Sequence, residues 1–472
     1  MIMLEFHKKK SKNPSKTEPE KRIKDFQEIY SQFDKNDSVE QSSRCSQCGI
    51  PYCQIHCPLN NNIPDWLRYI AEGRLEEAYQ VSASTNAFPE VCGRVCPQDR
   101  LCEGNCVVEQ AGFGAITIGN LEKYLTEIAW EKGWVKNLSS QNQYKQKVAI
   151  IGSGPAGMAA SAYLIQNGYQ VDVYEKNDRA GGLMIYGIPN FKLDKKIVER
   201  RTEWLTNSGV VFNLNTEVGK NISFQDLEKD YDAILIATGV YKARQLDINT
   251  SSVKNSIPAL DFLIESNRTG LGDPPSKNKY LTAKGKHVVV IGGGDTAMDC
   301  VRTAIRQQAK EVTCLYRRNK ENMPGSAREV LNAEQEGIKF NWLSVPSKII
   351  SDSAIATSMT YKVATLGEVD ESGRRKPIDT GVEKQIKSDL IIQALGFEPE
   401  DLNHNFKTNI ELTSWKTVKV DFKKFQTSNP KIFAAGDIVR GASLVVWAIH
   451  DGREVAKSIH NFLQSSKIKK AS

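Results

Sequence analysis

Eight of the ten cysteines in the 472-residue chain lie in two short clusters. The first cluster begins at Cys45 and reads CSQCGIPYCQIHCP, and the second begins at Cys92 and reads CGRVCPQDRLCEGNC. Thiolates are soft ligands that suit zinc ions or iron-sulfur clusters, and a compact run ending in Cys-Pro is typical of bacterial iron-sulfur segments. We therefore predict iron-sulfur clusters, with two structural zinc ions as the alternative. The candidate ligands are Cys45, Cys48, Cys53, Cys57, Cys92, Cys96, Cys102 and Cys106.

The segments that follow each cysteine cluster have apolar residues at helical spacing, so helices should hold the cysteine loops. They read IPDWLRYIAEGRLEEAYQVSAST and TIGNLEKYLTEIAWEKG. His56, among the cysteines, is expected to pack rather than to bind metal. The remaining cysteines, Cys300 and Cys314, are not spaced as a redox pair, so we expect them to be buried apolar residues.

A glycine-rich turn occurs in KVAIIGSGPAGMAASAYLIQNGYQVDVYEK, which begins at Lys147. The pattern predicts a buried strand, a turn with Gly152, Gly154 and Gly157, an apolar helix, and a second strand that ends at Glu175. Such glycines let the backbone approach a pyrophosphate, the helix N-terminus stabilises its charge, and the acid binds a ribose hydroxyl. The segment predicts a dinucleotide-binding unit.

A second turn of this kind occurs in KHVVVIGGGDTAMDCVRTAIRQQAKEVTCLYRRN. Gly292, Gly294 and Ala297 again lie between a predicted strand and a predicted helix. The second strand of this unit ends at Arg317 and Arg318 instead of an acid. Two arginines suit the additional phosphate of NADP, whereas a carboxylate suits a free ribose diol. This unit therefore predicts NADP rather than NAD.

Two repeated strand patterns indicate that one nucleotide domain is inserted in the other. DAILIATG at 232–239 is matched by DLIIQALG at 389–396, and the strand in KIFAAGD precedes Gly436 and Asp437. We expect an α/β fold with an N-terminal helical iron-sulfur domain. The predicted domains are a helical domain of residues 1–145, a first nucleotide domain of 146–283 and 390–472, and an inserted second nucleotide domain of 284–389.

Composition narrows the class of protein. The first residues lack the apolar run of a signal peptide, and no stretch approaches the twenty apolar residues of a membrane span. We expect a soluble, cytoplasmic protein with no membrane partner. Much of the formal charge of +7 lies in the first twenty-four residues, which we expect to be a solvated tail. Because no basic stripe is interleaved with aromatic residues, no nucleic-acid partner is predicted.

Paired dinucleotide turns followed by a terminal Gly-Asp resemble the flavoprotein disulfide-reductase architecture, in which the first unit binds FAD and the inserted unit binds NAD(P)H. Segments such as FPEVCGRVCPQDRLCEGNCV, GGLMIYGIPNFKL, RRNKENMPGSAREV and FAAGDIVRGASLVVWAIHDGRE resemble the small subunits of NADPH-dependent glutamate synthases. The likeness covers nearly the whole chain after about Asp25. It implies FAD, NADPH, two 4Fe-4S clusters, and a large subunit as partner and electron acceptor.

The resemblance also implies which residues bind the cofactors. No acid-base triad is expected, because the cofactors perform the chemistry. The dipole of a helix that begins after Gly441 should face the flavin ring. Expected to bind FAD are Gly152, Gly154, Pro155, Ala156, Gly157, Glu175, Gly182, Leu183, Gly239, Gly436, Asp437 and Ser443. Expected to bind NADPH are Gly292, Gly294, Asp295, Thr296, Ala297, Arg317 and Arg318.

In relatives the two cysteine sets interleave. By resemblance, one cluster has the ligands Cys45, Cys48, Cys53 and Cys106, and the other has Cys57, Cys96 and Cys102 with Glu122 as an oxygen ligand. Cys92 competes with Glu122 for the fourth position, because iron prefers thiolate.

The function expected from the resemblance is electron entry into glutamate synthase. NADPH would be oxidised by hydride transfer to FAD, and electrons would pass through the 4Fe-4S clusters to a large subunit that makes glutamate from glutamine and 2-oxoglutarate. The alternative within enzymes is an NADPH oxidoreductase of the same build that serves another acceptor, such as a ferredoxin. An alternative outside the enzymes is a nucleotide-binding scaffold without redox activity, in which structural zinc ions stabilise the N-terminal domain.

Overall fold

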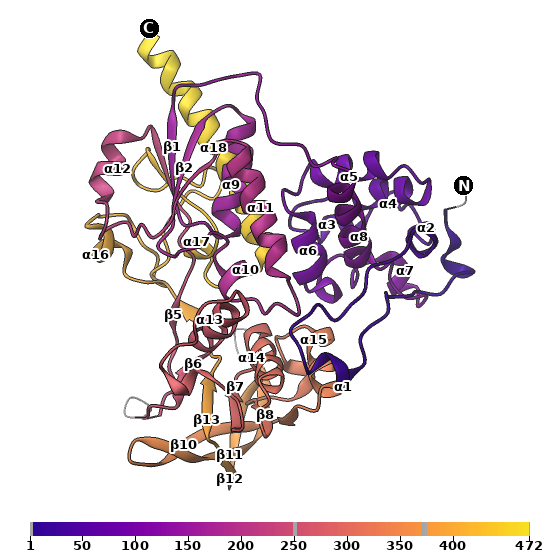
Figure 1. Cartoon of the computed structure of the whole chain (residues 1–472), viewed down its shortest axis with the longest axis vertical. Coiled ribbons are helices and arrows are strands. Elements are labelled where there is room, and N and C mark those ends of the chain that lie inside the picture. The colour runs from indigo at the N-terminus through magenta and orange to yellow at the C-terminus, as the bar shows by residue number, and fades with distance from the viewer. Residues whose placement is uncertain (1–2, 249–252, 370–372, 374, 472) are drawn as a thin grey trace.

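The chain forms an N-terminal group of helices and two α/β units, which lie side by side in Figure 1. The computed structural model describes residues 3–248, 253–369, 373 and 375–471. Within these ranges, no helix has the length and apolar character needed to cross a membrane. The predicted fold class, a helical domain followed by two dinucleotide-binding units, is confirmed.

Short helices surround the two cysteine clusters. Their core contains Trp66, Leu67, Leu121 and Leu125, all buried. The helical pattern after the first cluster is broken in two, because the chain turns at Gly73, where φ is +74°. The helices are α2 (Lys35–Ser43), α3 (Tyr52–Ile55), α4 (Ile63–Ala71), α5 (Leu75–Ala83), α6 (Pro89–Val95), α7 (Val107–Gln110) and α8 (Ile118–Glu131).

Most side chains of the basic N-terminal segment are exposed, as predicted, but the segment is packed against the rest of the chain and is not a free tail. Helix α1 (Pro19–Arg22) places Arg22 against the second α/β unit, where its Nε lies 2.9 Å from Glu336 Oε1 and its side chain is 2% exposed. The Thr17 amide donates to the Ile29 carbonyl, so the segment also folds back on its own chain. The ion pair joins Arg22 to a residue more than 300 positions away, and the composition of the segment gives no sign of it.

The first α/β unit is a parallel sheet with helices on both faces. One face packs on α9 (Pro155–Gln166), α11 (Lys195–Asn207) and α18 (Val445–Ala471), and the other on α12 (Phe224–Asp230) and α16 (Leu402–Phe406) (Figure 1). Its strand order is β15 (Ile432–Ala434), β4 (Ala233–Ile236), β1 (Lys147–Ile151), β2 (Gln170–Tyr174) and β3 (Val211–Asn213).

The second α/β unit is also a parallel sheet. One face packs on α13 (Ala259–Gly270), α14 (Asp295–Arg306) and α15 (Ala327–Gln335). The other face packs on an antiparallel sheet of β10 (Ser344–Asp352), β11 (Ile355–Val369) and β12 (Arg375–Lys387). Its strand order is β6 (Ser256–Pro258), β13 (Leu390–Gln393), β7 (His287–Ile291), β8 (Glu311–Leu315) and β9 (Lys339–Asn341).

This strand order differs from the predicted domain boundaries. We assigned 256–283 and 390–396 to the first nucleotide domain, but β6 and β13 pair with each other in the second sheet. The second unit therefore begins near residue 253 and ends near residue 394. The pairing joins strands more than 130 residues apart, and no local pattern in either segment shows which sheet it enters.

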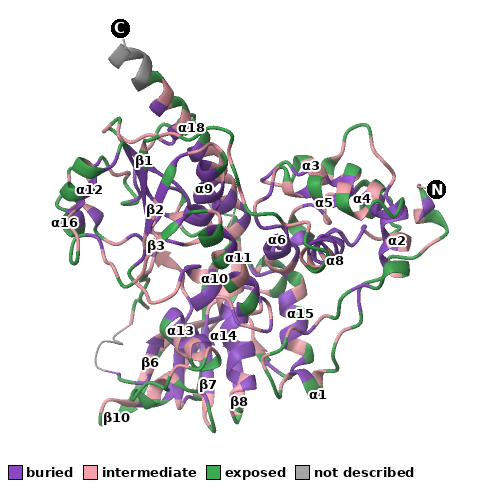
Figure 2. Cartoon of the chain, turned by 45° about the horizontal axis from the view of Figure 1, so that its top comes forward, coloured by how far each residue is buried: buried purple, intermediate pink, exposed green. Residues whose placement is uncertain are grey.

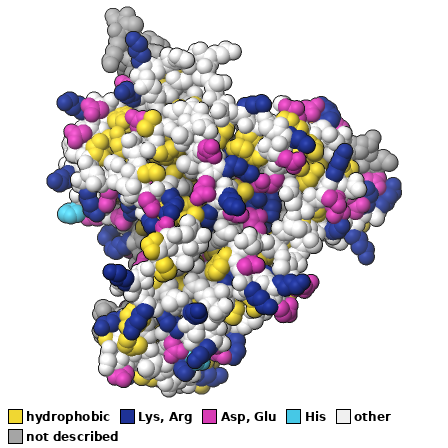
Figure 3. Space-filling view, in the orientation of Figure 1, with side chains coloured by type: hydrophobic (Ala, Val, Ile, Leu, Met, Phe, Trp, Pro, Cys, Tyr) yellow, Lys and Arg dark blue, Asp and Glu magenta, His cyan; other side chains and the backbone are white. Residues whose placement is uncertain are grey.

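Buried residues follow the sheets and their covering helices, while exposed residues lie on the outer helices and loops (Figure 2). On the face drawn in Figure 3, lysine and arginine side chains are interspersed with acidic ones across all three parts.

Candidate functional site

A cavity of about 140 Å³ opens to solvent at the carboxyl ends of the strands of the first sheet. Ligands of doubly wound sheets bind at this edge, because the loops there leave a crevice. The predicted FAD residues that line it are Gly152, Gly154, Pro155, Ala156, Glu175, Leu183, Gly239, Asp437 and Ser443.

The other three predicted FAD residues lie behind the wall of this cavity. A Cβ atom at Gly157 would lie 2.1 Å from the Gly152 carbonyl oxygen, and one at Gly182 would lie 2.7 Å from Gly154 Cα. A Cβ atom at Gly436 would lie 2.9 Å from Ala156 Cβ. These glycines permit close packing around the turn.

The cavity wall also contains residues that the sequence did not single out. Lys176, Thr216, Tyr241 and Glu400 line it, and burial raises the pKa of Tyr241 above its usual range. Thr238 Oγ1 is buried in this wall and has no hydrogen-bond partner among the described residues. A buried hydroxyl without a partner is costly unless a ligand or water satisfies it. The position directly after a buried strand is the only sequence signal for Thr238.

Glu175 holds the first turn in place. One carboxylate oxygen accepts hydrogen bonds from the Ser153 amide at 3.1 Å and the Ser153 hydroxyl at 2.6 Å. The other oxygen accepts from the Asn177 amide and its side chain, at 2.9 and 2.8 Å. The predicted acid therefore lines the cavity and also fixes the loops on both sides of it.

Asp437 is the first residue of the short helix α17 (Asp437–Arg440). Burial raises its pKa to about 7, against the opposing effect of the Ser443 amide, which hydrogen-bonds its charged form. Helix α18 begins at Val445, four residues after Gly441, as the sequence predicted in outline.

The turn of the second unit is built in the same way. Gly292 has φ of +145°, and a Cβ atom there would lie 2.2 Å from the Ala394 carbonyl oxygen. Gly294 is the N-cap of α14, so the first amides of this helix are directed at the turn. Asp295 begins that helix, and its Oδ1 accepts a hydrogen bond from the Ser326 amide at 2.9 Å.

The structure separates the two arginines after β8. Arg317 is exposed, whereas Arg318 is 8% exposed and its Nε donates a hydrogen bond to the Arg375 carbonyl at 2.7 Å. Arg318 thus ties β8 to β12, and Arg317 is the more accessible cation.

The cysteines lie in two neighbourhoods that interleave along the sequence, although among the described residues no three His, Cys, Asp or Glu side chains are already close enough to hold a metal ion. In the first group, burial raises the pKa of Cys53 to about 12, and the charges of Cys45, Cys106 and Cys48 add to the shift. Cys53 therefore lies near Cys45, Cys48 and Cys106, although Cys106 is more than fifty residues away in sequence. Cys102 of the second group is also near Cys53, so the two groups adjoin.

The second group lines one cavity. Its members are Cys57, Cys92, Cys96, Cys102 and Glu122. Burial raises the pKa of Glu122 to about 8, while Asn86 Nδ2 donates a hydrogen bond to its Oε1 at 3.2 Å. A carboxyl group buried among thiols is costly without a cation, which the iron of a cluster would supply. Both competitors for the fourth position, Glu122 and Cys92, face this cavity.

Neither the cysteines outside the clusters nor His56 lines the cavity of the second cysteine group. Cys300 and Cys314 are fully buried in the core of the second unit, as predicted. His56 is exposed, and its Nδ1 lies 2.9 Å from the Tyr52 carbonyl oxygen.

Comparisons with known proteins agree with this division of the chain. The family model described as dihydropyrimidine dehydrogenase domain II, 4Fe-4S cluster, matches residues 22–134. The family model described as pyridine nucleotide-disulphide oxidoreductase matches residues 146–452.

Among curated proteins, the glutamate synthase (NADPH) small chain of Azospirillum brasilense is 51% identical over 467 residues, which are 98% of this chain and 97% of that one. The Escherichia coli protein of the same name is 45% identical and covers 94% of this chain and 96% of its own length. Among solved structures, FprA of Mycobacterium tuberculosis in complex with NADPH matches 69% of this chain and 86% of its own, with a TM-score of 0.58 at 19% identity. This likeness shows the fold alone.

Proposed function

The chain belongs to the family of the NADPH-dependent glutamate synthase small chains, and from this premise we propose that it is the electron-entry subunit of such an enzyme. It oxidises NADPH and passes the electrons to a large subunit that makes glutamate from glutamine and 2-oxoglutarate. The observation that carries the proposal is the combination, in one chain, of two dinucleotide turns with two interleaved cysteine groups.

The first cavity fits FAD. The turn from Gly152 to Gly154 places the N-terminus of α9 at the cavity, where its amides would bind the pyrophosphate. Thr238 and Asp437 offer polar groups at the wall for the remainder of the molecule. When bound, FAD supplies hydride acceptance and the release of single electrons. The chain orients the two nucleotides and supplies the electrostatic environment.

The second turn fits NADPH. Gly292, Gly294 and the N-terminus of α14 would bind its pyrophosphate, with Asp295, Thr296 and Ala297 in the first turn of that helix. We propose Arg317 as the main contact of the 2′-phosphate, because Arg318 is buried and engaged with Arg375. Arg318 would then position the loop that carries Arg317.

We propose two 4Fe-4S clusters, one on Cys45, Cys48, Cys53 and Cys106, the other on Cys57, Cys96, Cys102 and Glu122. The proximity of Cys53 to Cys45, Cys48 and Cys106 and the shared cavity of the second set support this pairing. Anaerobically prepared protein should contain about eight irons and eight acid-labile sulfides per chain.

Replacement of single ligands tests the pairing. Cys106→Ser should remove the cluster of Cys45, Cys48 and Cys53 and leave the other. Cys92→Ser should leave both clusters in place. Loss of a cluster in Cys92→Ser would transfer the ligand role from Glu122 to Cys92, and loss of the second cluster in Cys106→Ser would overturn the interleaved pairing.

The face of the helical domain that carries exposed apolar side chains near the first cysteine group in sequence is the proposed docking surface for the large subunit. Most of these residues lie within two positions of Cys48, Cys53 or Cys106, and large exposed apolar side chains that gather on one face mark interaction sites. These residues are Ile50, 64% exposed, Ile55, 57% exposed, Tyr52, Val107 and Phe113. A cluster that lies under the docking surface gives electrons a short exit.

Reconstitution with a large subunit tests the whole proposal. The isolated chain should reduce artificial dyes with NADPH but make no glutamate, and addition of a glutamate synthase large subunit from the same source should give NADPH-driven glutamate formation. Ile55→Ser with Phe113→Ser should weaken that coupling and leave dye reduction intact. Trp415→Ser, which removes a still more exposed aromatic side chain in the first α/β unit, is the control.

The alternative acceptor is not favoured, because relatives at 42–51% identity over nearly the full chain are named glutamate synthase small chains. Rapid reduction of a ferredoxin, together with no binding to any large subunit, would reverse this choice. We place the protein in the cytoplasm, because a reducing compartment keeps ten cysteines available as thiols.

A further inference from the structure

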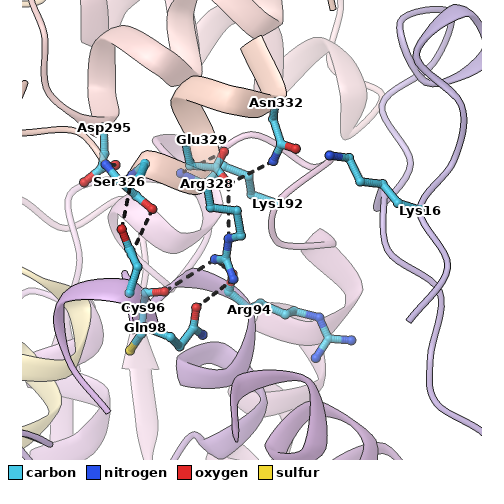
Figure 4. A network of polar contacts seen from close by, with 12 residues as sticks. Lys16, Arg94, Cys96, Gln98, Lys192, Asp295, Ser326, Arg328, Glu329 and Asn332 are labelled. Atoms are coloured by element: carbon cyan, nitrogen blue, oxygen red, sulfur yellow. Dashed lines mark hydrogen bonds and ion pairs between the residues drawn. The ribbon is translucent and has the colours of Figure 1, made fainter. Parts of the chain in front are cut away.

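The loop that follows Cys96 is joined to the second α/β unit by a polar network (Figure 4). The carboxylate of Asp99, in this loop, accepts hydrogen bonds from the Ser326 hydroxyl at 3.1 Å and the Ala327 amide at 3.2 Å. Ser326 is the N-cap of α15, but its own side chain makes no capping bond. The helical domain thus supplies the acceptor that the N-terminus of α15 needs.

The opposite contact runs from α15 to the end of α6. Arg328 Nη1 donates to Gln98 Oε1 at 2.7 Å, and its Nη2 lies 3.4 Å from the Cys96 carbonyl oxygen and 3.5 Å from that of Arg94. Gln98 Nε2 donates to the carbonyls of Cys92 and Gly93, at 3.2 and 3.0 Å.

These carbonyls belong to the last turn of α6, whose C-cap is Cys96. The last carbonyls of a helix lack intrahelical partners and carry partial negative charge, so a guanidinium there both satisfies them and opposes their charge. Asp99 and Arg328 are therefore reciprocal helix caps, each supplied by one part of the chain to a helix of the other.

The N-terminus of α15 is also bonded to the second glycine turn. The Gly325 amide donates to the Gly293 carbonyl at 2.9 Å, and the Ser326 amide donates to Asp295 Oδ1. Arg100, next to Asp99, donates to the Pro324 carbonyl at 2.6 Å and lies 3.4 Å from Asp295 Oδ2. A continuous set of hydrogen bonds thus links the turn proposed for NADPH to the loop of Cys96.

From this arrangement we infer that Arg328 is a positioning residue for the cluster of Cys57, Cys96 and Cys102, and that it couples this cluster to occupancy of the Gly292 turn. The inference rests on the proposed function, since it presumes a cluster on these cysteines. Arg328 fixes the Cys96 backbone and places a positive charge near the cluster. A nearby positive charge favours the more negative, reduced form of the cluster, so its removal lowers the reduction potential.

Redox titration of the intact protein, followed by electron paramagnetic resonance, tests the inference. Arg328→Gln should lower the midpoint potential of the second cluster by about 59 mV, a tenfold change for one electron, and leave that of the first cluster unchanged. Arg328→Lys, which keeps the charge, should recover most of the shift. Arg100→Gln is the matched control, because it alters the same interface but not the end of α6. The Arg100 side chain is 45% exposed and its charge is screened by solvent, so both potentials should change much less than in Arg328→Gln.

Amide hydrogen exchange tests the proposed coupling between the Gly292 turn and the second cluster. In the native protein, NADP⁺ should slow amide hydrogen exchange in residues 94–100, and Arg328→Gln should abolish this effect while flavin content stays the same. Unchanged potentials in Arg328→Gln, an equal shift of both clusters, or undiminished protection by NADP⁺ would overturn the inference. Should Arg328→Gln fail to fold, Arg328→Lys and Asp99→Asn test the coupling, since each weakens the link between α15 and residues 94–100 and should reduce the protection by NADP⁺ in part. Protein that holds no second cluster at all would instead refute the proposed function.

Discussion

The two dinucleotide units share the geometry of their turns and differ in the segments beyond them. Gly152 and Gly292 both have positive φ, +104° and +145°, and a Cβ atom on either would lie within 2.5 Å of a carbonyl oxygen on the neighbouring strand. Gly154 and Gly294 are both N-caps, and a Cβ atom on either meets no atom within 4 Å, so space is left at the same place for a ligand. The turn itself specifies a pyrophosphate but not which dinucleotide carries it.

The difference lies at the end of the second strand and in the covering helices. In the first unit, Glu175 is buried and accepts hydrogen bonds from both flanking loops. Helix α18 also packs closely on α9, since a Cβ atom at Gly452 would lie 2.4 Å from the Ala156 carbonyl oxygen. In the second unit the corresponding loop carries the exposed Arg317. This difference agrees with our proposal that the first unit encloses resident FAD and that Arg317 of the second unit contacts the 2′-phosphate of NADPH.

The largest expected effect comes from the first glycine of each turn. Gly152→Ala and Gly292→Ala each force a Cβ atom onto a strand carbonyl and add strain of about 1–3 kcal/mol from positive φ. Gly152→Ala should eliminate flavin binding. Gly292→Ala should retain the flavin but reduce NADPH-dependent dye reduction at least about 100-fold, since the local turn is lost. Flavin absorbance and stopped-flow reduction measure the two results.

Gly154→Ala and Gly294→Ala are the matched controls for this prediction. Their Cβ atoms meet no protein atom, so thermal stability should stay near that of the native protein while affinity for the dinucleotide falls. Equal loss of flavin in Gly152→Ala and Gly292→Ala would show that the two units do not bind separate cofactors.

The next largest effect is expected at Arg317, in the loop after the second strand of the NADPH unit. Arg317→Ala should weaken NADPH by roughly thirtyfold, on the order of 2 kcal/mol, and leave NADH nearly unchanged, because only NADPH carries the 2′-phosphate. Arg318→Ala should lower thermal stability as well, because it removes the bond to the Arg375 carbonyl. Apparent KM values for both nucleotides measure the effect. Equal losses for NADPH and NADH in Arg317→Ala would contradict the assignment.

The sequence predicted the turns well because their information is local. Strand, glycine spacing, helix and terminal acid or arginine all lie close together in each segment, and each is found where the pattern places it. The sequence could not assign β6 and β13 to the second sheet, since parallel pairing between distant strands leaves no trace in either strand alone.

The candidate sites were predictable to the same extent. Residues on the turns line the first cavity as expected, but Thr238 and Tyr241 enter it from a loop whose sequence shows only that a strand has ended. The pairing of Cys106 with Cys53 came from resemblance to a family, because nothing in the spacing of the cysteines brings them together. The partner of Arg22 was likewise beyond prediction, since its ion pair depends on how two domains dock.

A smaller effect is expected from the acid of the first unit. Glu175→Gln keeps the volume of the side chain, but an amide can accept at only one of the two positions where Glu175 accepts backbone amides. One backbone amide would then face an NH₂ group, at a cost of about 1–2 kcal/mol, so FAD affinity should fall about tenfold. Fluorescence titration of the FAD-free variant measures the affinity. Glu217→Gln, in a residue that lines the same cavity but is partly exposed, is the control. An unchanged affinity in Glu175→Gln would show that the turn keeps its shape without the acid.

The smallest effect is a pH dependence that the buried Asp437 adds to the first unit. In the second unit, burial raises the pKa of Asp299 to about 6, against the opposing charge of Lys192. Burial raises the pKa of Asp437 from 3.8 to about 7. Between these values the folded FAD-free protein binds more protons at this carboxyl than the unfolded chain does, so its stability decreases as the pH rises through the window. From about pH 6 to 8, the unfolding temperature of FAD-free protein should fall by a few degrees, and that of Asp437→Asn should fall less, because an amide does not titrate.

Thermal unfolding followed by circular dichroism measures how the unfolding temperature of each protein changes with pH. Parallel slopes for the two proteins would mean that Asp437 is already charged in the folded state, and that Ser443 and Arg440 outweigh its burial.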